Sequence, residues 1–204
     1  TKTAVQRTKT LNVSSIDLTT EAAATASLLS LGKADCYKLL AVKQALSFGT
    51  INSSNPASID ITHLFKFDSG QTGLIYDLGS LTRINEQVKI TGSIRISFEY
   101  FSHSDGDYFN VDSYENVIPY TDIEAKLRDT LDFRPVRNDS GTGFNTTNVG
   151  ILKSGYNITA DYSYYLPRVD IIVLNRDKSI TLLTGTSAIK PIAPNIPVDS
   201  MPLY

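Results

Sequence analysis

The sequence has few residues of the kinds that build metal sites and disulfides. It contains one cysteine, Cys36, and two histidines, His63 and His103. One cysteine excludes an internal disulfide and any multi-cysteine metal site, and neither histidine belongs to an H-x-x-H or H-E-x-x-H zinc pattern. We therefore expect Cys36 to be a buried small hydrophobe, both histidines to be structural or surface residues, and the chain to hold no metal or other cofactor.

Long apolar runs and an excess of positive charge are also missing. Uncharged stretches such as Leu46 to Ile59 are rich in Ser, Asn, Thr and Gly, so none supplies the roughly 20 apolar residues of a membrane span. The net charge is -2 and the pI is near 5.6, which argues against nucleic acid, because phosphate contacts need clustered cations. The only basic stretch carries Lys2, Arg7 and Lys9, and we interpret it as a solvated segment.

Alternating apolar and polar residues predict several strands. The pattern is strict in "IDITHLFKF" (59–67) and in "SIRISFEYF" (93–101), and the apolar run "CYKLLAVKQALSF" (36–48) suits both helix and strand, of which we favour strand. Further strands are predicted in "DYSYYLP", "RVDIIVLN" and "SITLLTG", with "NRDK" as the turn of a hairpin between the last two. Ile171 to Leu174 is apolar on both faces, which predicts a central place in its sheet.

Helix signals are short and few. "TEAAATASLLSL" (20–31) begins with cap residues and runs through alanines to a glycine, which predicts a helix. A capping-box spacing before 122–130 predicts a second one. Residues 137–155 are rich in Asn, Ser, Thr and Gly and indicate a long exposed loop, with a weak strand near 149–152 as an option. Prolines at every third position in 191–197 predict a stiff extended tail.

These elements predict a mainly β (α+β) fold, with antiparallel sheets or a sandwich-like module, one or two short helices and long loops. We expect residues 1–32 to be an N-terminal connecting segment with a short helix, 33–190 to be a β-rich module, and 191–204 to be a proline-rich extended linker to a following module. The chain begins at Thr1 and ends directly after "DSMPL", which suggests a piece of a longer protein.

The motifs of catalysis are weak or absent. Asp105, Asp107, Asn110 and Asp112 lie close together in "HSDGDYFNVD" and have the oxygen ligands that calcium prefers. The EF-hand register is not met, and "DGD" after a strand is typical of a tight turn, which we favour. "GTGFNT" lacks the residues of a phosphate loop, and no G-x-S-x-G nucleophile elbow occurs. We therefore assign no catalytic residue and expect no enzyme.

Five blocks of the sequence carry a resemblance to a known family. They are "LFKFDSGQTGLIYDLGSL", "FEYFSHSDGDYFNVDSY", "LRDTLDFRPVR", "DYSYYLPRVDIIVLNRD" and "PNIPVDSMPLY". In this order, over about residues 33–204, they resemble a segment of large virion structural proteins of contractile-tailed phages, of the baseplate-wedge and tail-fibre-network type. Where that family commonly shows D-N-G-Q-R followed by two tyrosines, this chain keeps Gly70, Gln71, Tyr76 and Asp77 but lacks the arginine.

The resemblance implies assembly rather than catalysis. It predicts a non-enzymatic module of a phage tail or baseplate, made in the cytoplasm of the host bacterium and placed in the virion. Its partners would be other tail or baseplate subunits, or further copies of the chain, with no nucleic acid and no membrane. A tail-associated hydrolase is a third, less favoured interpretation.

Charges beside prolines and aromatics predict an internal brace. Arg128, Asp132 and Arg134 lie in "LRDTLDFRPVR", and Arg168 and Asp170 lie in "LPRVD". Bidentate bonds between arginine and carboxylate suit a helix end tied to a strand. We predict that Asp132 or Arg134 bonds the segment around Arg168 and Asp170, or else backbone groups of the long loop.

Tyrosines suggest the alternative function, a receptor- or glycan-binding module of a tail fibre. The chain has 11 tyrosines, and aromatic side chains with a polar tip suit both sugar and protein surfaces. The candidate interface residues are Tyr108, Tyr114, Tyr162, Tyr164 and Tyr165.

Overall fold

The computed structural model of the chain describes residues 1–114, 131–145, 155 and 157–203. The chain forms two compact units, Thr1–Tyr162 and Ser163–Tyr204. Strands make up most of the regular structure, and only short helical turns accompany them. The predicted mainly β class with short helices is therefore confirmed.

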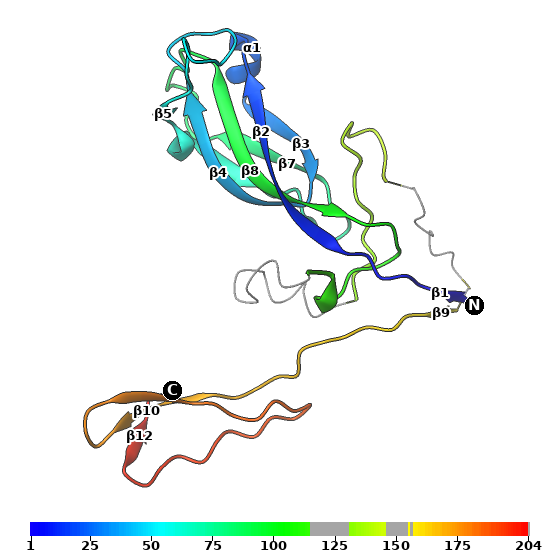
Figure 1. Cartoon of the computed structure of the whole chain (residues 1–204), viewed down its shortest axis with the longest axis vertical. Helices are drawn as coiled ribbons and strands as arrows, with labels where there is room; N and C mark the ends of the chain where they lie inside the picture. Colours follow the sequence, from blue (N-terminus) through cyan, green and yellow to red (C-terminus); the bar gives the residue numbers. More distant parts are fainter. Residues whose placement is uncertain (115–130, 146–154, 156, 204) are drawn as a thin grey trace. The chain divides into compact units, whose positions relative to one another are not determined.

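The first unit contains a four-stranded antiparallel sheet in the order β2-β8-β4-β5 (Figure 1). Its strands are β2 Lys9–Leu18, β8 Ile94–His103, β4 Cys36–Gln44 and β5 Ile59–Asp60. The strands predicted in 93–101 and in 36–48 are confirmed as β8 and β4. The pairing of β2 with β8 runs from Lys9 opposite His103 to Leu18 opposite Ile94, so it places Lys9 beside the end of β8.

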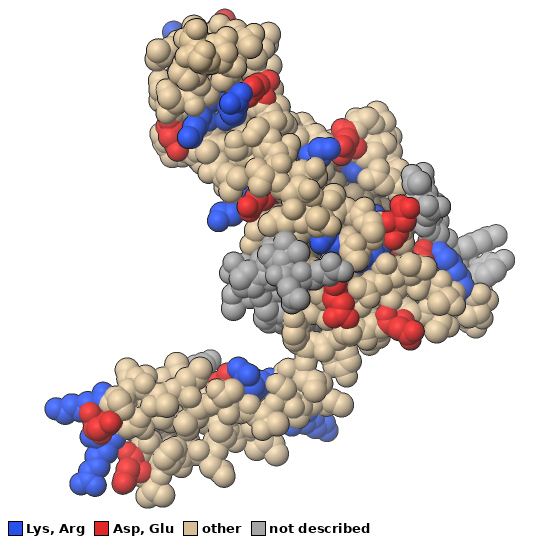
Figure 2. All heavy atoms as spheres, in the orientation of Figure 1, with Lys and Arg blue, Asp and Glu red and all other residues tan. Residues whose placement is uncertain are grey.

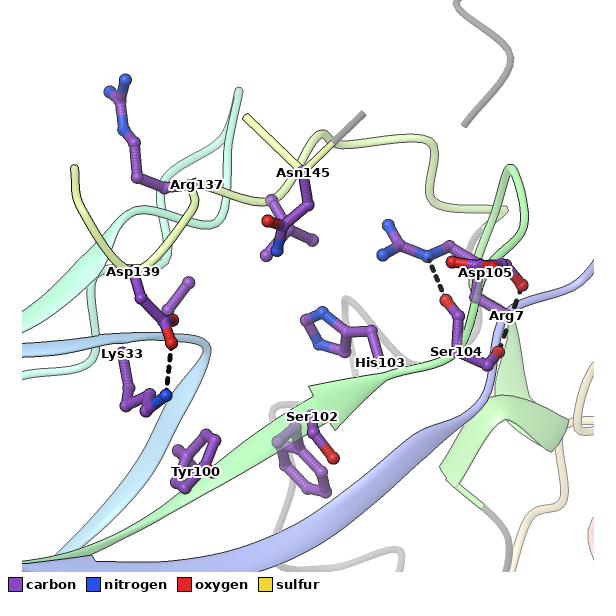
Figure 3. Close-up of a pocket in the computed structure, with 13 residues that line it drawn as sticks. Arg7, Lys33, Tyr100, Ser102, His103, Ser104, Asp105, Arg137, Asp139 and Asn145 are labelled. Carbon is purple, nitrogen blue, oxygen red and sulfur yellow. Dashed lines mark hydrogen bonds and ion pairs between the residues drawn. The ribbon is translucent and has the colours of Figure 1, made fainter. Parts of the chain in front are cut away.

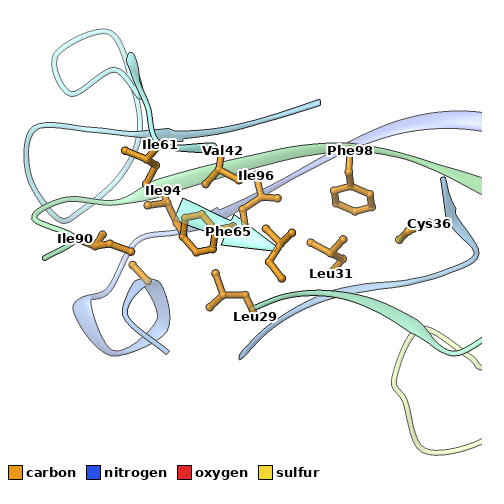
Figure 4. Packing of buried hydrophobic residues seen from close by; sticks show 12 residues of the cluster. Leu29, Leu31, Cys36, Val42, Ile61, Phe65, Ile90, Ile94, Ile96 and Phe98 are labelled. Atoms are coloured by element: carbon orange, nitrogen blue, oxygen red, sulfur yellow. The ribbon is translucent and has the colours of Figure 1, made fainter. Parts of the chain in front are cut away.

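A second, three-stranded antiparallel sheet packs against the first through the hydrophobic core. Its order is β3-β7-β6, with β3 Leu28–Ala34, β7 Leu78–Arg83 and β6 Phe65–Asp68. Figure 4 shows side chains of both sheets meeting between them. The fully buried members of the cluster include Leu31, Val42, Leu81, Ile94, Ile96 and Phe98.

Cys36 belongs to the same core and is buried, as predicted. Burial raises the pKa of its thiol to about 12, so at neutral pH the sulfur is a thiol and not the thiolate that acts as a nucleophile. Gly79 of β7 lies directly against it, because a Cβ atom added there would come within 2.5 Å of the Cys36 sulfur. The cysteine therefore fills space between the two sheets.

Shorter elements complete the first unit. The strands β1 Lys2–Thr3 and β9 Ile158–Thr159 pair in parallel, α1 spans Glu21–Ala24, and two 3-10 turns span Thr62–Leu64 (η1) and Val111–Tyr114 (η2). No helix of the described residues is long and apolar enough to cross a membrane.

The helix predicted over 20–31 is wrong beyond its first turn. Thr20 caps α1 by accepting a hydrogen bond from the Ala23 amide, but the helix ends at Ala24. Residues 28–34 instead form β3, in which Leu29 and Leu31 point into the core and their neighbours do not. Pairing with β7 overrides the weak helix propensity of this stretch.

The strand predicted over 59–67 is interrupted. Ile59–Asp60 pairs with β4, whereas Phe65–Asp68 pairs with β7 of the other sheet. Between them η1 turns the chain, and the Asp60 carboxylate accepts a hydrogen bond from the Thr62 amide. One straight strand cannot pair in both sheets. The alternating pattern therefore indicated the burial of some of the side chains, but it did not indicate that the backbone turns between the two sheets.

The second unit is a three-stranded antiparallel sheet in the order β11-β10-β12. Its strands are β10 Ile171–Asn175, β11 Ile180–Leu183 and β12 Ser200–Pro202. The predicted hairpin with its "NRDK" turn and the central place of β10 are both confirmed. Lys178 has a φ of 69° in that turn.

The last residues are not the free extended tail that the prolines predicted. β12 pairs with β10, and the Leu203 amide donates to the Ile172 carbonyl oxygen at 2.8 Å. Pro202 lacks an amide proton but lies in an edge strand, where none is required. The strand predicted in 161–167 is also absent. The observed division after Tyr162 differs from the predicted boundaries after residues 32 and 190.

Some predictions lie outside the described residues, namely the helix over 122–130, the weak strand near 149–152 and the place of Arg128. Of the predicted loop over 137–155, the structure describes a turn in which Arg137 pairs with Phe144.

Candidate functional site: a buried charge network beside a polar cavity

The first group of the site is a lysine buried among aromatic rings. Lys9 is 1% exposed, and its Nζ lies 4.3 to 5.5 Å from four ring centroids. The rings are those of Tyr76, Phe101, Phe109 and Tyr114. Cation–π attraction of this kind is stronger where water is excluded. The prediction that the N-terminal basic stretch is solvated is therefore wrong for Lys9, and also for Arg7, which is 4% exposed.

Asp35 supplies the opposite charge. It lies between β3 and β4 with a φ of 52° and a fully buried carboxylate. That carboxylate accepts hydrogen bonds from Lys9 Nζ and His103 Nε2, both at 2.7 Å, and from Gln71 Nε2 at 2.5 Å. Burial alone would raise the pKa of Asp35, but Lys9 and His103 outweigh it and lower the pKa to about 2. The carboxylate is thus ionised and fully engaged.

His103 is held neutral in this network. Burial lowers its pKa, and the charges of Lys9 and Arg7 lower it further against the opposing pull of Asp35. Since Nε2 faces a carboxylate oxygen, the proton of the neutral ring is on Nε2 and is donated to Asp35. A second full cation on the oxygen that already binds Lys9 would leave uncompensated positive charge in the core.

Acid is expected to destabilise the protein through His103. Its pKa in the folded state lies below the unfolded value of 6.5, so below pH 6.5 the unfolded chain takes up a proton that the folded chain does not, and stability falls as pH falls. Asp35 adds a further loss of stability as the pH falls from 3.8 to about 2.

Urea unfolding at pH 7.5, 6.5 and 5.5 measures the effect of His103. In His103→Gln, which keeps a donor but does not titrate, the slope over this range should be smaller, whereas His63→Gln should keep it. Equal slopes in all three proteins would contradict the assignment.

The network continues to a second ion pair through Tyr76. Lys9 Nζ donates to the Tyr76 hydroxyl at 3.1 Å, and that hydroxyl donates to the Asp132 carboxylate at 2.5 Å. Burial and the neighbouring carboxylates raise the pKa of Tyr76, so the phenol keeps its proton. Asp132 is itself 7% exposed and forms a backbone bridge with Phe109 in both directions. Tyr76 therefore connects both ion pairs.

Arg134 closes this second pair. Its Nε and Nη2 donate to the Asp132 carboxylate at 2.8 to 3.1 Å, Nη1 donates to the Thr72 carbonyl oxygen at 2.5 Å, and the guanidinium carbon lies 4.1 Å from the centroid of the Tyr76 ring. Despite the opposing effect of burial, the bonds to Asp132 raise the pKa of Arg134. Through Thr72 and Tyr76 the pair ties residues 132–134 to residues 72–76, which are distant in the sequence.

The structure brings the predicted brace residues together in a different way. Asp132 bonds Arg134 in the first unit, and Arg168 bonds Asp170 at 2.9 Å in the second. The backbone partner of Arg134 is Thr72 and not the long loop. A bond between the two pairs joins different units and stays a prediction.

Two of the five candidate interface tyrosines are buried. Tyr108 is 2% exposed and donates to the Asp161 carbonyl oxygen, and Tyr114 is 5% exposed and packs edge-on against Phe101. Both lie in the interior, so the prediction that they form a surface is wrong. Tyr162, Tyr164 and Tyr165 are each slightly more than half exposed.

Asp107 and Asn110, two of the four residues weighed as calcium ligands, are bonded within the protein. Asp107 binds Lys2 and accepts from the Val5 amide at 2.8 Å, and the Asn110 side chain accepts from the Asp112 amide at 3.0 Å. Among the residues that the structure describes, no three His, Cys, Asp or Glu side chains are grouped to hold a metal ion.

A polar cavity of about 270 Å³ lies beside the network. Figure 3 shows its lining side chains, which come from the N-terminal segment, the end of β3, the end of β8 and the turn after Arg137. The lining residues include Arg7, Lys33, Tyr100, Ser102, His103, Asp105, Arg137, Asp139 and Asn145. His103 therefore faces the network through Nε2 and also borders the cavity.

The sequence contained one signal for this site. Gln71, Tyr76 and Asp77, which match the pattern that the sequence resembles, bind Asp35, Asp132 and Arg137 respectively. No pattern indicated Lys9 or Asp35, because their pairing depends on strands that are distant in the sequence. Comparison with protein-family models, with curated proteins and with solved structures found no match for the chain.

Proposed function

We propose that the chain is a non-enzymatic structural module of a phage tail or baseplate, held in place by contacts with other subunits of the virion. The observation that carries this proposal is an apolar sheet face in the second unit. The ordered resemblance to virion structural proteins supplies the type of assembly.

The register of the second sheet defines this apolar face. Residues directly opposite in neighbouring strands share a face, and Ile172 is opposite Leu182, while Leu174 is opposite both Ile180 and Met201. The apolar face consists of Ile172, Leu174, Ile180, Leu182, Met201 and Leu203. None of the six is charged, and none is buried.

The second unit has little core of its own. Val173 is the only buried hydrophobic residue among its described members. Units of this size seldom fold on internal burial alone and need a staple or a partner. In the view of Figure 2 many charged side chains of this unit gather at one end and others lie along its edges, and the surface between them is uncharged. An apolar surface of a neighbouring subunit is the partner of matching chemistry.

The buried groups of the first unit support a structural role. The Asp35 carboxylate has three hydrogen-bond donors and the Asp132 carboxylate has Tyr76 and Arg134. A general base needs a lone pair directed at a substrate, whereas these carboxylates are engaged within the protein. Such networks fix the geometry of a core.

Purified particles of the parent phage test the proposal. We expect mass spectrometry to find the chain in the particles and electron microscopy to place it in the tail. Phage carrying Leu182→Lys should incorporate at least about tenfold less of the chain, equivalent to 1.4 kcal/mol of contact energy. Thr181→Lys is the matched control, because it puts the same charge on the same exposed strand but on the opposite face. Absence of the wild-type chain from particles would overturn the proposal.

A receptor- or glycan-binding module of a tail fibre is the second candidate. The three half-exposed tyrosines Tyr162, Tyr164 and Tyr165 favour it, since exposed aromatic rings stack on sugars. An array of bacterial surface glycans distinguishes the candidates. Glycan binding that is lost in Tyr164→Ala would support this second function. No binding to any glycan of the array would exclude it.

A further inference from the structure

The cavity contains a buried arginine whose outer nitrogen atoms have no acceptor. Arg7 is 4% exposed, and its Nε donates to the Ser104 carbonyl oxygen at 3.1 Å. The two terminal nitrogen atoms form no hydrogen bond or ion pair with any residue that the structure describes. In Figure 3 they extend from this bond toward the space between His103 and Asn145. Buried donors without an acceptor are costly, and for an ionised group the cost is larger.

The surroundings hold the Arg7 side chain in this position. Its guanidinium carbon lies 4.7 Å from the centroid of the Phe109 ring, and its backbone amide donates to the Tyr108 carbonyl oxygen at 2.7 Å. Gly106, with a φ of 148°, lets the side chain pass, because a Cβ atom at that position would lie 2.7 Å from the Arg7 Cγ. A guanidinium fixed in this way loses little conformational entropy when it binds a ligand.

Among the described residues of the cavity wall, Arg7 is also the cation that has no ion pair with a carboxylate. Lys33 binds Asp139, and Arg137 binds Asp77 at 3.0 Å. Burial lowers the pKa of Arg7, and the nearby carboxylates raise it only in part. An anion is therefore the ligand that would compensate the charge and satisfy the donors together.

Charge and size indicate which anion. The forked donors of a guanidinium match the two oxygen atoms of a carboxylate or of a phosphate. Asp105 lines the cavity, and Asp35 and Asp107 lie close enough to act on Arg7, so a single negative charge is favoured over a double one. The volume of 270 Å³ is just below the range of about 300–1,000 Å³ for ligand pockets, which suits a small acid.

We propose that this cavity, the carboxylate pocket, binds one small monocarboxylate through the terminal nitrogen atoms of Arg7. The carboxylate belongs to a free acid, to an acidic sugar or to an acidic side chain presented in the same way. The assignment does not depend on the chain being a virion component. A further polar group at the wall, the side chain of Asn145, is available to the rest of the ligand.

Titration followed by ¹⁵N NMR of the arginine side chains tests the pocket. The probes are acetate, glucuronate, N-acetylglutamic acid α-amide and dianionic phosphate, added at pH 8 and constant ionic strength to the whole chain. We expect a saturable shift of the Arg7 Nε signal with the carboxylates and at least tenfold weaker binding of phosphate. Tighter binding of glucuronate than of acetate assigns an acidic sugar, and tighter binding of the glutamate derivative assigns a protein side chain.

Two variants control the experiment. Arg7→Gln should weaken acetate binding at least tenfold, whereas Arg95→Gln should leave it unchanged, because Arg95 is an exposed arginine bound to Asp17 at the other end of β8. If Arg7→Gln fails to fold, the comparison of acetate with phosphate in the wild-type protein decides. Shifts that do not saturate, that chloride reproduces, or that are equal at Arg7 and Arg95 would show that water alone fills the cavity and would overturn the proposal.

Discussion

Replacement of Lys9 by methionine is expected to lower the free energy of unfolding by about 3–5 kcal/mol, the cost typical of removing one partner from a buried ion pair. Methionine fills much of the space of the lysine chain, so packing changes little. Asp35 remains fully buried and retains only Gln71 and the neutral His103 as donors. The loss therefore comes from an uncompensated carboxylate. Urea unfolding at pH 7.5 measures it.

Two further measurements separate this cause from a packing defect. Lys38→Met in β4 removes an exposed lysine and should change stability by less than about 0.5 kcal/mol. In Lys9→Met the histidine is the remaining titratable partner of Asp35, so its pKa should rise above 6.5 and part of the lost stability should return as pH falls from 7.5 to 6. A cost below about 1 kcal/mol that does not change with pH would contradict the role assigned to Lys9.

Replacement of Asp132 by alanine should have an effect of similar size, about 3–5 kcal/mol, because it leaves the Tyr76 hydroxyl without its acceptor and the Arg134 guanidinium with only the Thr72 carbonyl oxygen. The side chain of Arg134 is 11% exposed, so water replaces the lost carboxylate poorly. Arg134→Lys should also destabilise, since an ammonium group cannot bond both carboxylate oxygens and the Thr72 carbonyl in the same planar arrangement. Thermal and urea unfolding of the variants measure these losses.

The first unit contains a matched control for this pair. Arg95 binds Asp17 with two bonds of 2.7 Å, a geometry close to that of Arg134 and Asp132, but the two side chains are 43% and 33% exposed. Asp17→Ala should therefore cost at most about 1 kcal/mol. Equal costs for Asp17→Ala and Asp132→Ala would show that burial does not decide the energy of the second pair.

The two buried ion pairs, Lys9 with Asp35 and Arg134 with Asp132, give the first unit a polar interior region beside its apolar core. The sandwich core between the sheets is built from aliphatic and aromatic side chains. The network lies at the start of β2 and the end of β8, where it joins the N-terminal segment, the turn after β3, the segment before β7 and residues 132–137. The network therefore ties the described parts that lie outside the sheets to the sandwich. That property agrees with the proposed structural role, in which the module would keep its shape while other subunits contact it.

Local pattern determined much of the secondary structure. The alternation in Ile94, Ile96 and Phe98 predicted β8, and the turn residues between β10 and β11 predicted their hairpin, because a half-buried strand and a tight turn each leave their mark within a few residues. The same reasoning predicted the mainly β class, whereas the burial of Cys36 was predicted because a lone cysteine without a reactive motif is usually a buried small hydrophobe. The pattern that the sequence resembles also contains Gln71, Tyr76 and Asp77, which the structure places in or beside the network.

Tertiary structure alone decided the features that depend on distant partners. Residues 28–34 became a strand because β7 was available to pair with them, and the proline-containing tail joined a sheet because β10 had an open edge. Lys9 became a core residue because the fold places Asp35 and four aromatic rings around it. The energy of a charge depends on its surroundings in space, and a sequence window around Lys9 contains neither its carboxylate nor its rings.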